Sequence, residues 1–155
     1  MSKKNSNVIL KSGFRNYGEL SNIYLNFKKK LNLFKKKKFL IAVSGGPDSL
    51  ALAALAKSYN YENRSKIFYV LVDHKLRKDS SREAQLVKKL LKKHGIDLYI
   101  LKNNKIINKN IQSEARKVRY SLLTSFCKKK KINVILTAHN LEDQVETFFI
   151  RLSRG

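Results

Sequence analysis

Four short apolar runs alternate with amphipathic stretches along the chain, and this alternation restricts the folds that it can adopt. The runs are FLIAV (39–43), IFYVLV (67–72), DLYIL (97–101) and NVILTA (133–138). Nearly continuous apolar strands are typical of a parallel sheet that is covered on both faces. The stretches between them repeat apolar residues at helical spacing, so an α/β fold with helices on both faces is predicted. The predicted helices cover residues 47–58, 80–94 and 111–130, and a further helix begins at Leu141.

Polar residues follow three of the predicted strands directly. Residues 44–49 follow the first strand, Asp73 and His74 follow the second, and residues 139–143 follow the fourth. Parallel sheets bind their ligands at the carboxyl ends of the strands. The sequence therefore predicts one ligand site at this edge of the sheet.

The segment SGGPDS (44–49) lies between a buried strand and a helix and has the composition of a phosphate-binding loop. A helix start presents unpaired backbone N–H groups and a positive dipole end, which favour an anion. Gly45 and Gly46 allow a tight turn and a close approach of the backbone. Ser44 and Ser49 add hydroxyl donors, so the segment predicts a phosphate site.

Two familiar phosphate motifs are absent from the sequence, because neither GxxxxGK[ST] nor GxGxxG occurs. The Asp48 carboxylate would repel a bare anion, but it would bind Mg²⁺ if the ion lay between the carboxylate and the phosphate. Pro47 stands in the first helical turn, where a missing N–H costs nothing. The alternative is a tight turn with a capped helix and no ligand.

The chain carries 34 Lys and Arg residues against 11 Asp and Glu, a formal net charge of +23. Such an excess usually indicates a polyanionic partner, and RNA, DNA and an anionic membrane all fit it. Lys, Asn and Ile are abundant together, so biased nucleotide composition of the genome is an alternative explanation for the size of the excess. The charge thus indicates a class of partner without selecting one member.

Residues 1–38 are predicted to be a basic amphipathic helical extension, followed by the main domain at 39–155. The extension either packs on the domain through its apolar stripe or serves as an RNA-binding arm. The stripe consists of Leu20, Ile23, Tyr24, Phe27, Leu31 and Phe34.

Cys127 is the only cysteine, which excludes a disulfide framework and a multi-cysteine metal site within this chain. It falls in an apolar helical pattern and is predicted to lie in the core. The apolar run at 50–56 is far shorter than the roughly 18 residues of a membrane span. The first 13 residues lack a signal-peptide core, so the expected location is the cytoplasm.

The loop SGGPDS resembles the SGGxDS signature of the PP-loop ATP pyrophosphatases. Within that superfamily the chain is similar to the tRNA(Ile)-lysidine synthetases through VDHKLR (72–77), SEARKVRYSLL (113–123) and AHNLEDQVETFFIRLSRG (138–155). The resemblance implies a Rossmann-like domain of the adenine nucleotide α-hydrolase type over residues 39–155. It also implies cleavage of ATP between its α and β phosphates with adenylation of a substrate.

The resemblance further implies roles for individual residues. Nucleotide binding is implied for Ser44, Gly45, Gly46, Pro47, Asp48, Ser49, Asp73 and His74, and for an arginine that is either Arg116 or Arg119. Arg119 lies nearer the apolar face of the predicted helix at 111–130 and is favoured; that face consists of Ile111, Ala115, Val118, Leu122 and Phe126. The implied catalytic residues are Asp48, Arg119, His139 and Asp143, with Asp48 as a ligand of Mg²⁺. A helix cap at Asn140 is the alternative explanation for Asp143.

The implied activity is that of a ligase. ATP activates C2 of the wobble cytidine in tRNA(Ile) with a CAU anticodon, and free lysine then displaces AMP to leave lysidine. The implied ligands are ATP, Mg²⁺, lysine and this tRNA, and a homodimer is one assembly that the resemblance allows. A PP-loop tRNA thiolase is an alternative, although it would normally bring paired cysteines. The other alternative is an ATP- and RNA-binding fragment without turnover, because the family continues beyond the RLSRG at which this chain stops.

Overall fold

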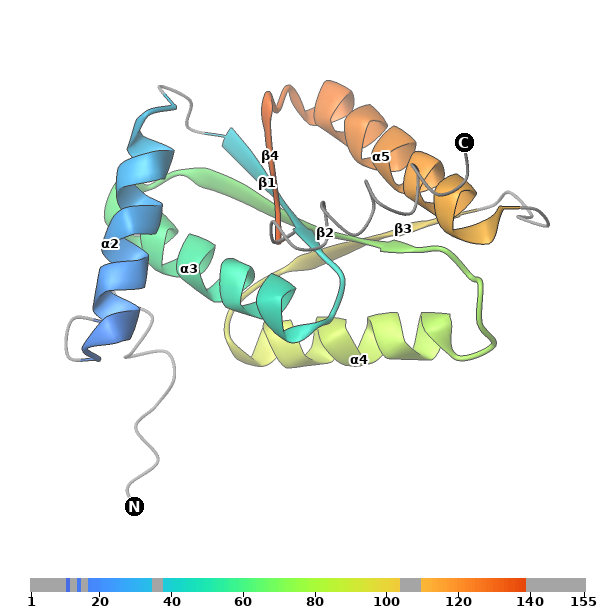
Figure 1. Cartoon of the computed structure of the whole chain (residues 1–155), viewed down its shortest axis with the longest axis horizontal. Helices are drawn as coiled ribbons and strands as arrows, with labels where there is room; N and C mark the ends of the chain where they lie inside the picture. Colours follow the sequence, from blue (N-terminus) through green and yellow to red (C-terminus); the bar gives the residue numbers. More distant parts are fainter. Residues whose placement is uncertain (1–10, 12–13, 15–16, 35–37, 104–109, 139–155) are drawn as a thin grey trace, which may run out of the picture.

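A computed structural model describes residues 11, 14, 17–34, 38–103 and 110–138 of the chain. In this part four parallel strands form one sheet in the order β3-β2-β1-β4 (Figure 1). The strands are β1 (Lys38–Val43), β2 (Lys66–Asp73), β3 (Leu98–Lys102) and β4 (Val134–Thr137). The helices are α2 (Glu19–Asn32), α3 (Pro47–Asn63), α4 (Ser80–Lys93) and α5 (Ile111–Lys130).

Every predicted strand is present, and each of its ends lies within two residues of the predicted position. The predicted helix at 111–130 is found at those bounds. The predicted end of the first helix at Ser58 is wrong, because α3 continues to Asn63 and stops where Arg64 adopts a left-handed conformation (φ 47°). No glycine or proline follows Ser58 to end the helix earlier. The helix predicted from Leu141 lies outside the described residues.

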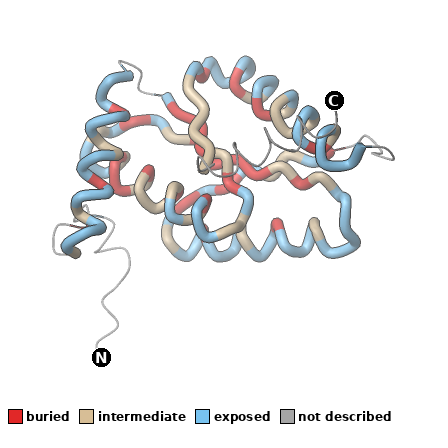
Figure 2. Tube along the Cα trace, in the orientation of Figure 1, coloured by how far each residue is buried: buried red, intermediate tan, exposed pale blue. Residues whose placement is uncertain are grey.

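Helices cover both faces of the sheet, as the apolar strands predicted. Figure 1 shows α3 and α4 on one face and α5 on the other. Neighbouring residues of β1 point to opposite faces: Ile41 packs in the cluster that contains Ala53 of α3, whereas Leu40 packs with Leu123 of α5. Figure 2 shows buried residues along the strands and on the inward sides of the helices. Cys127 is buried in the α5 layer, which confirms its predicted place in the core.

Helix α2 packs against the domain beside the carboxyl end of α3. Tyr24 and Leu31 are buried in a cluster with Phe39 and Tyr59. The Tyr59 hydroxyl donates a hydrogen bond to Oδ1 of Asn32 at 2.9 Å. The predicted stripe is only partly buried, because Leu20, Ile23 and Phe34 are 48%, 51% and 46% exposed.

The parallel register places all four carboxyl strand ends at one edge of the sheet. Val43 of β1 lies beside Leu71 of β2, and Ala42 lies beside Thr137 of β4. The residues that follow β1 and β2 therefore meet at this edge, where β4 also ends. Within the described part of the chain, no helix is both long and apolar enough to cross a membrane.

Candidate functional site

A cavity of about 440 Å³ opens at the carboxyl edge of the sheet. Its wall combines the ends of β1, β2 and β4 with the starts of α3 and α4 and one side of α5. The polar side chains that line it are Ser44, Ser49, Asp73, His74, Arg77, Ser80, Glu83, Arg119 and Thr137. The edge at which the sequence predicted a ligand site is thus the edge that is hollowed.

The two glycines of the loop differ in what they require of the backbone. Gly45 has φ +94°, a conformation that residues with a Cβ rarely adopt, and a Cβ built there would lie 2.9 Å from Cγ2 of Val87. Gly46 has φ −72° and ψ 162°, which any residue adopts, and a Cβ there would meet only Oγ of Ser44, at 3.7 Å. Gly45 therefore allows the turn and its packing on α4, whereas Gly46 leaves open space at the start of α3.

Ser49 holds the loop in shape. Its buried Oγ accepts hydrogen bonds from the backbone N–H groups of Ser44 and Gly45, both at 3.1 Å, and donates one to the Gly46 carbonyl at 2.9 Å. The Ser49 hydroxyl was predicted as a donor to a ligand, but in the structure it donates its hydrogen bond to the Gly46 carbonyl of the loop itself. In the structure it is the residue that fixes the curvature of the loop.

The first turn of α3 has no side-chain cap. Pro47 and Asp48 occupy its first two positions and are exposed. The backbone N–H groups at this helix start are available to an anion, and the dipole favours one there. Asp48 is not part of the cavity wall and lies at the helix start beside it. Among the described residues, no three His, Cys, Asp or Glu side chains gather as a metal site.

Asp73 is buried at the end of β2 and organises the loop that leads to α4. Its Oδ1 accepts hydrogen bonds from the Lys75 backbone N–H at 3.0 Å and the Ser80 hydroxyl at 2.9 Å, and its Oδ2 accepts one from the Ser81 hydroxyl. Burial opposes the charge of this carboxylate, but the hydrogen bonds from Ser81, Lys75 and Ser80 outweigh it and lower the pKa of Asp73 below its ordinary value. Both oxygens are engaged within the loop.

His74 and Arg119 meet across the cavity from different elements. Nε of Arg119 donates a hydrogen bond to Nε2 of His74 at 3.3 Å, although the two residues are 45 positions apart. Burial lowers the pKa of His74, and the Arg119 guanidinium lowers it further, while the Asp73 carboxylate acts in the opposite direction. Because Nε2 accepts the hydrogen bond from Arg119, the proton of the neutral imidazole is assigned to Nδ1. Nδ1 is buried and has no hydrogen-bond partner among the described residues.

The two candidate arginines of α5 occupy different positions. Arg119 lines the cavity, whereas Arg116 is exposed outside it, with its guanidinium over the ring of Tyr120. The residue favoured for nucleotide contact is thus the one that the structure places in the cavity wall. His139 and Asp143 lie outside the described residues.

Sequence reasoning missed four polar residues of the cavity wall, namely Arg77, Ser80, Glu83 and Thr137. Arg77 and Glu83 form an exposed ion pair at 2.9 Å across the turn between β2 and α4, and Ser80 holds Asp73 as described above. Arg77 belongs to the VDHKLR segment, so the motif itself could have drawn attention to it. Ser80 and Glu83 give no signal in the sequence beyond that of an ordinary helix start.

Residues 19–155 match the family model of the PP-loop domain. The chain belongs to the PP-loop family. A chain of this family from Orientia tsutsugamushi (strain Boryong), a tRNA(Ile)-lysidine synthase, is 41% identical over 141 residues, which are 86% of the present chain and 32% of that protein. The tRNA(Ile)-lysidine synthase of Rickettsia bellii (strain OSU 85-389) is 42% identical over 122 residues. These residues are 78% of the present chain and 28% of the Rickettsia bellii protein.

A third relative shows the same partial coverage. The tRNA(Ile)-lysidine synthase of Wolbachia pipientis wMel is 40% identical over 125 residues, 79% of this PP-loop chain and 29% of that protein. The chain thus spans about a third of the length of these relatives. Among solved structures, the U34-tRNA thiolase NcsA from Methanococcus maripaludis with its [4Fe-4S] cluster superposes with a TM-score of 0.67. It is 19% identical, the match covers 86% of this chain and 52% of the thiolase, and the likeness shows the shared fold.

Proposed function

We propose that this PP-loop chain is the adenylating part of a tRNA(Ile)-lysidine synthetase, a cytoplasmic ATP-dependent ligase. The proposal rests on one observation: Ser44 and Ser49 of the glycine loop line the same cavity as Arg119, and α3, which starts in this loop, has no side-chain cap. The identity of about 40% to tRNA(Ile)-lysidine synthases supports the choice of reaction.

ATP would lie with its phosphates over residues 44–49. The start of α3 would supply N–H groups and a dipole that stabilise the negative charge on the departing pyrophosphate. Arg119, held by neutral His74, would offset the charge that develops on the α phosphate. Gly46 keeps the approach to the helix start open.

Asp48 is the residue that would hold Mg²⁺. Magnesium is usually bound through one or two carboxylates together with substrate phosphates, so a single exposed carboxylate at the phosphate end of the cavity fits. The ion would neutralise phosphate charge in the complex. The carboxylate itself would be kept away from the phosphate oxygens by this arrangement.

The proposed substrate is the wobble cytidine of tRNA(Ile) with a CAU anticodon. O2 of the cytosine bonds to the α phosphorus as the bond to pyrophosphate breaks. The unprotonated ε-amine of free lysine then bonds to C2, and AMP leaves with the oxygen. His139 and Asp143 are proposed to act near the adenylated base. The proposed oligomeric state is a homodimer.

Two alternatives make different predictions. A thiolase of this fold would need sulfur chemistry, and the only cysteine, Cys127, is buried in the α5 layer away from the cavity. A fragment without turnover would bind ATP but hold tRNA mainly by charge, with affinity that falls steeply with salt and little preference among tRNAs.

The proposal is tested by measuring pyrophosphate release and, in the same reaction, the mass of the modified nucleoside in the tRNA. The chain is incubated with ATP, Mg²⁺, lysine and either tRNA(Ile) with a CAU anticodon or an unrelated tRNA, and the digested tRNA is analysed by mass spectrometry. Lysine-dependent formation of lysidine in tRNA(Ile) alone supports the ligase. ATP binding without any product supports the fragment, and failure to bind ATP contradicts the assignment of the cavity.

A further inference from the structure

A second arginine of α5 lies over an aromatic ring of the same helix. The guanidinium carbon of Arg116 lies 5.6 Å from the ring centroid of Tyr120. The two residues are four apart on the helix, Arg116 is exposed and Tyr120 is half-buried. Arg116 takes part in none of the ion pairs found among the described residues.

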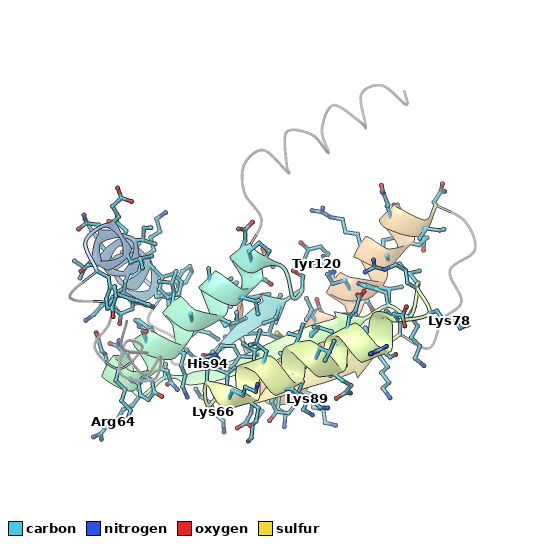
Figure 3. The ribbon with its side chains drawn as sticks, turned by 90° about the horizontal axis from the view of Figure 1, so that it is seen from below. Arg64, Lys66, Lys78, Lys89, His94 and Tyr120 are labelled. Carbon is cyan, nitrogen blue, oxygen red and sulfur yellow. The ribbon has the colours of Figure 1, made fainter. Side chains whose placement is uncertain are left out.

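The helical repeat places this pair at the edge of the cavity. Arg119 and Leu123 line the cavity from α5 and are also four residues apart. Arg116 and Tyr120 each precede one of these by three residues, so they form the adjacent row on the same side of the helix. In Figure 3 the Tyr120 side chain extends from α5 toward the middle of the molecule. The pair therefore lies beside the proposed nucleotide site.

A similar pair elsewhere in the chain has a clear structural use. Lys57 lies 4.9 Å from the ring centroid of Tyr61, and its ammonium donates a hydrogen bond to the Gly95 carbonyl at 2.8 Å. That pair fastens α3 to the loop after α4. Among the described residues, no ion pair fastens the Arg116–Tyr120 pair to another element, and a guanidinium is planar whereas an ammonium is not.

We propose that Arg116 and Tyr120 form a stacking platform for an unpaired base of the RNA substrate, held beside the nucleotide cavity. The inference rests on the proposed function, since it assigns a place to the base that is adenylated. Proteins hold splayed-out RNA bases on aromatic rings and on arginine planes. Loss of one such stack weakens single-strand binding by about 5- to 150-fold.

The test uses the full chain and a short RNA stem–loop with a CAU anticodon, in which the wobble cytidine is replaced by fluorescent pyrrolocytidine. Stacking on the platform is expected to change this fluorescence upon binding. Tyr120→Leu is expected to abolish the change and to weaken binding by roughly tenfold or more. Tyr120→Phe keeps the ring and should behave like the wild type.

Two further variants separate stacking from charge and from folding. Arg116→Lys keeps the charge, and because the side chain is exposed the substitution should leave folding unchanged. It should reduce the fluorescence change while leaving the dependence of affinity on salt unaltered. Tyr61→Leu removes the ring of the other pair, about 21 Å along α3 from its start, and should have no effect.

ATP affinity, measured by calorimetry on the same variants, keeps the two proposals apart. Unchanged ATP affinity with lost fluorescence change supports the platform. Unchanged fluorescence in Tyr120→Leu and Arg116→Lys overturns the platform and leaves the ATP site intact. If the two variants weaken ATP binding as much as RNA binding, the stack serves the adenine ring and the inference is wrong.

Discussion

The replacement of Gly46 by valine is expected to separate ligand binding from folding. Gly46 has φ −72° and ψ 162°, a backbone conformation that β-branched residues adopt readily. The nearest atom to an added Cβ is Oγ of Ser44 at 3.7 Å, an ordinary contact. The free energy of unfolding should therefore change by no more than about 0.5 kcal/mol.

Binding of ATP should nevertheless fall sharply in this variant. The branched side chain would stand where a phosphate approaches the N–H groups at the start of α3. A hydrogen bond to a charged group contributes about 1.5–3 kcal/mol. The loss of one such bond lowers the affinity by roughly 10- to 150-fold, which calorimetric titration of Mg-ATP would detect.

Gly45→Ala is the matched control for the loop. Its φ of +94° and the distance of 2.9 Å between the added Cβ and Val87 both penalise the folded state, by about 1–3 kcal/mol in total. Urea denaturation should show this loss for Gly45→Ala and not for Gly46→Val. Equal ATP affinity of Gly46→Val and wild type would refute the assignment of the loop, and equal stability of Gly45→Ala and wild type would refute its described geometry.

Two further substitutions test single carboxylates. Asp48→Asn should weaken ATP binding in the presence of Mg²⁺ far more than in its absence, and equal losses in calorimetry under both conditions would argue against a metal ligand. Asp73→Asn should destabilise the fold by about 1–3 kcal/mol at pH 7, because the buried loop donors lose a charged acceptor. Since folding lowers the pKa of Asp73, its contribution is present above the ordinary value of 3.8 and is lost as the pH falls through the folded pKa. Urea denaturation of the two proteins should thus converge in acid, whereas Asp97→Asn, a control that removes an exposed ion pair with Lys92, should change little at either pH.

The strand pattern and the position of the ligand edge were readable from the sequence. Continuous apolar runs predicted strands that the structure confirms, because a strand covered on both faces needs apolar side chains in both directions. The segment SGGPDS predicted a loop at a helix start for a similarly local reason. These properties depend on neighbouring residues, which any reader of the sequence can see together.

The partners of individual side chains were decided by tertiary structure alone. Arg116 and Arg119 look alike in the sequence, and only the packing of α5 places Arg119 against His74, 45 residues away. Gly45 and Gly46 are adjacent and identical, yet only Gly45 packs against Val87 of α4. Asp73 binds hydroxyls that come from the start of the next helix. Such contacts depend on how the crossover helices return to the sheet, and no short stretch of sequence contains both partners.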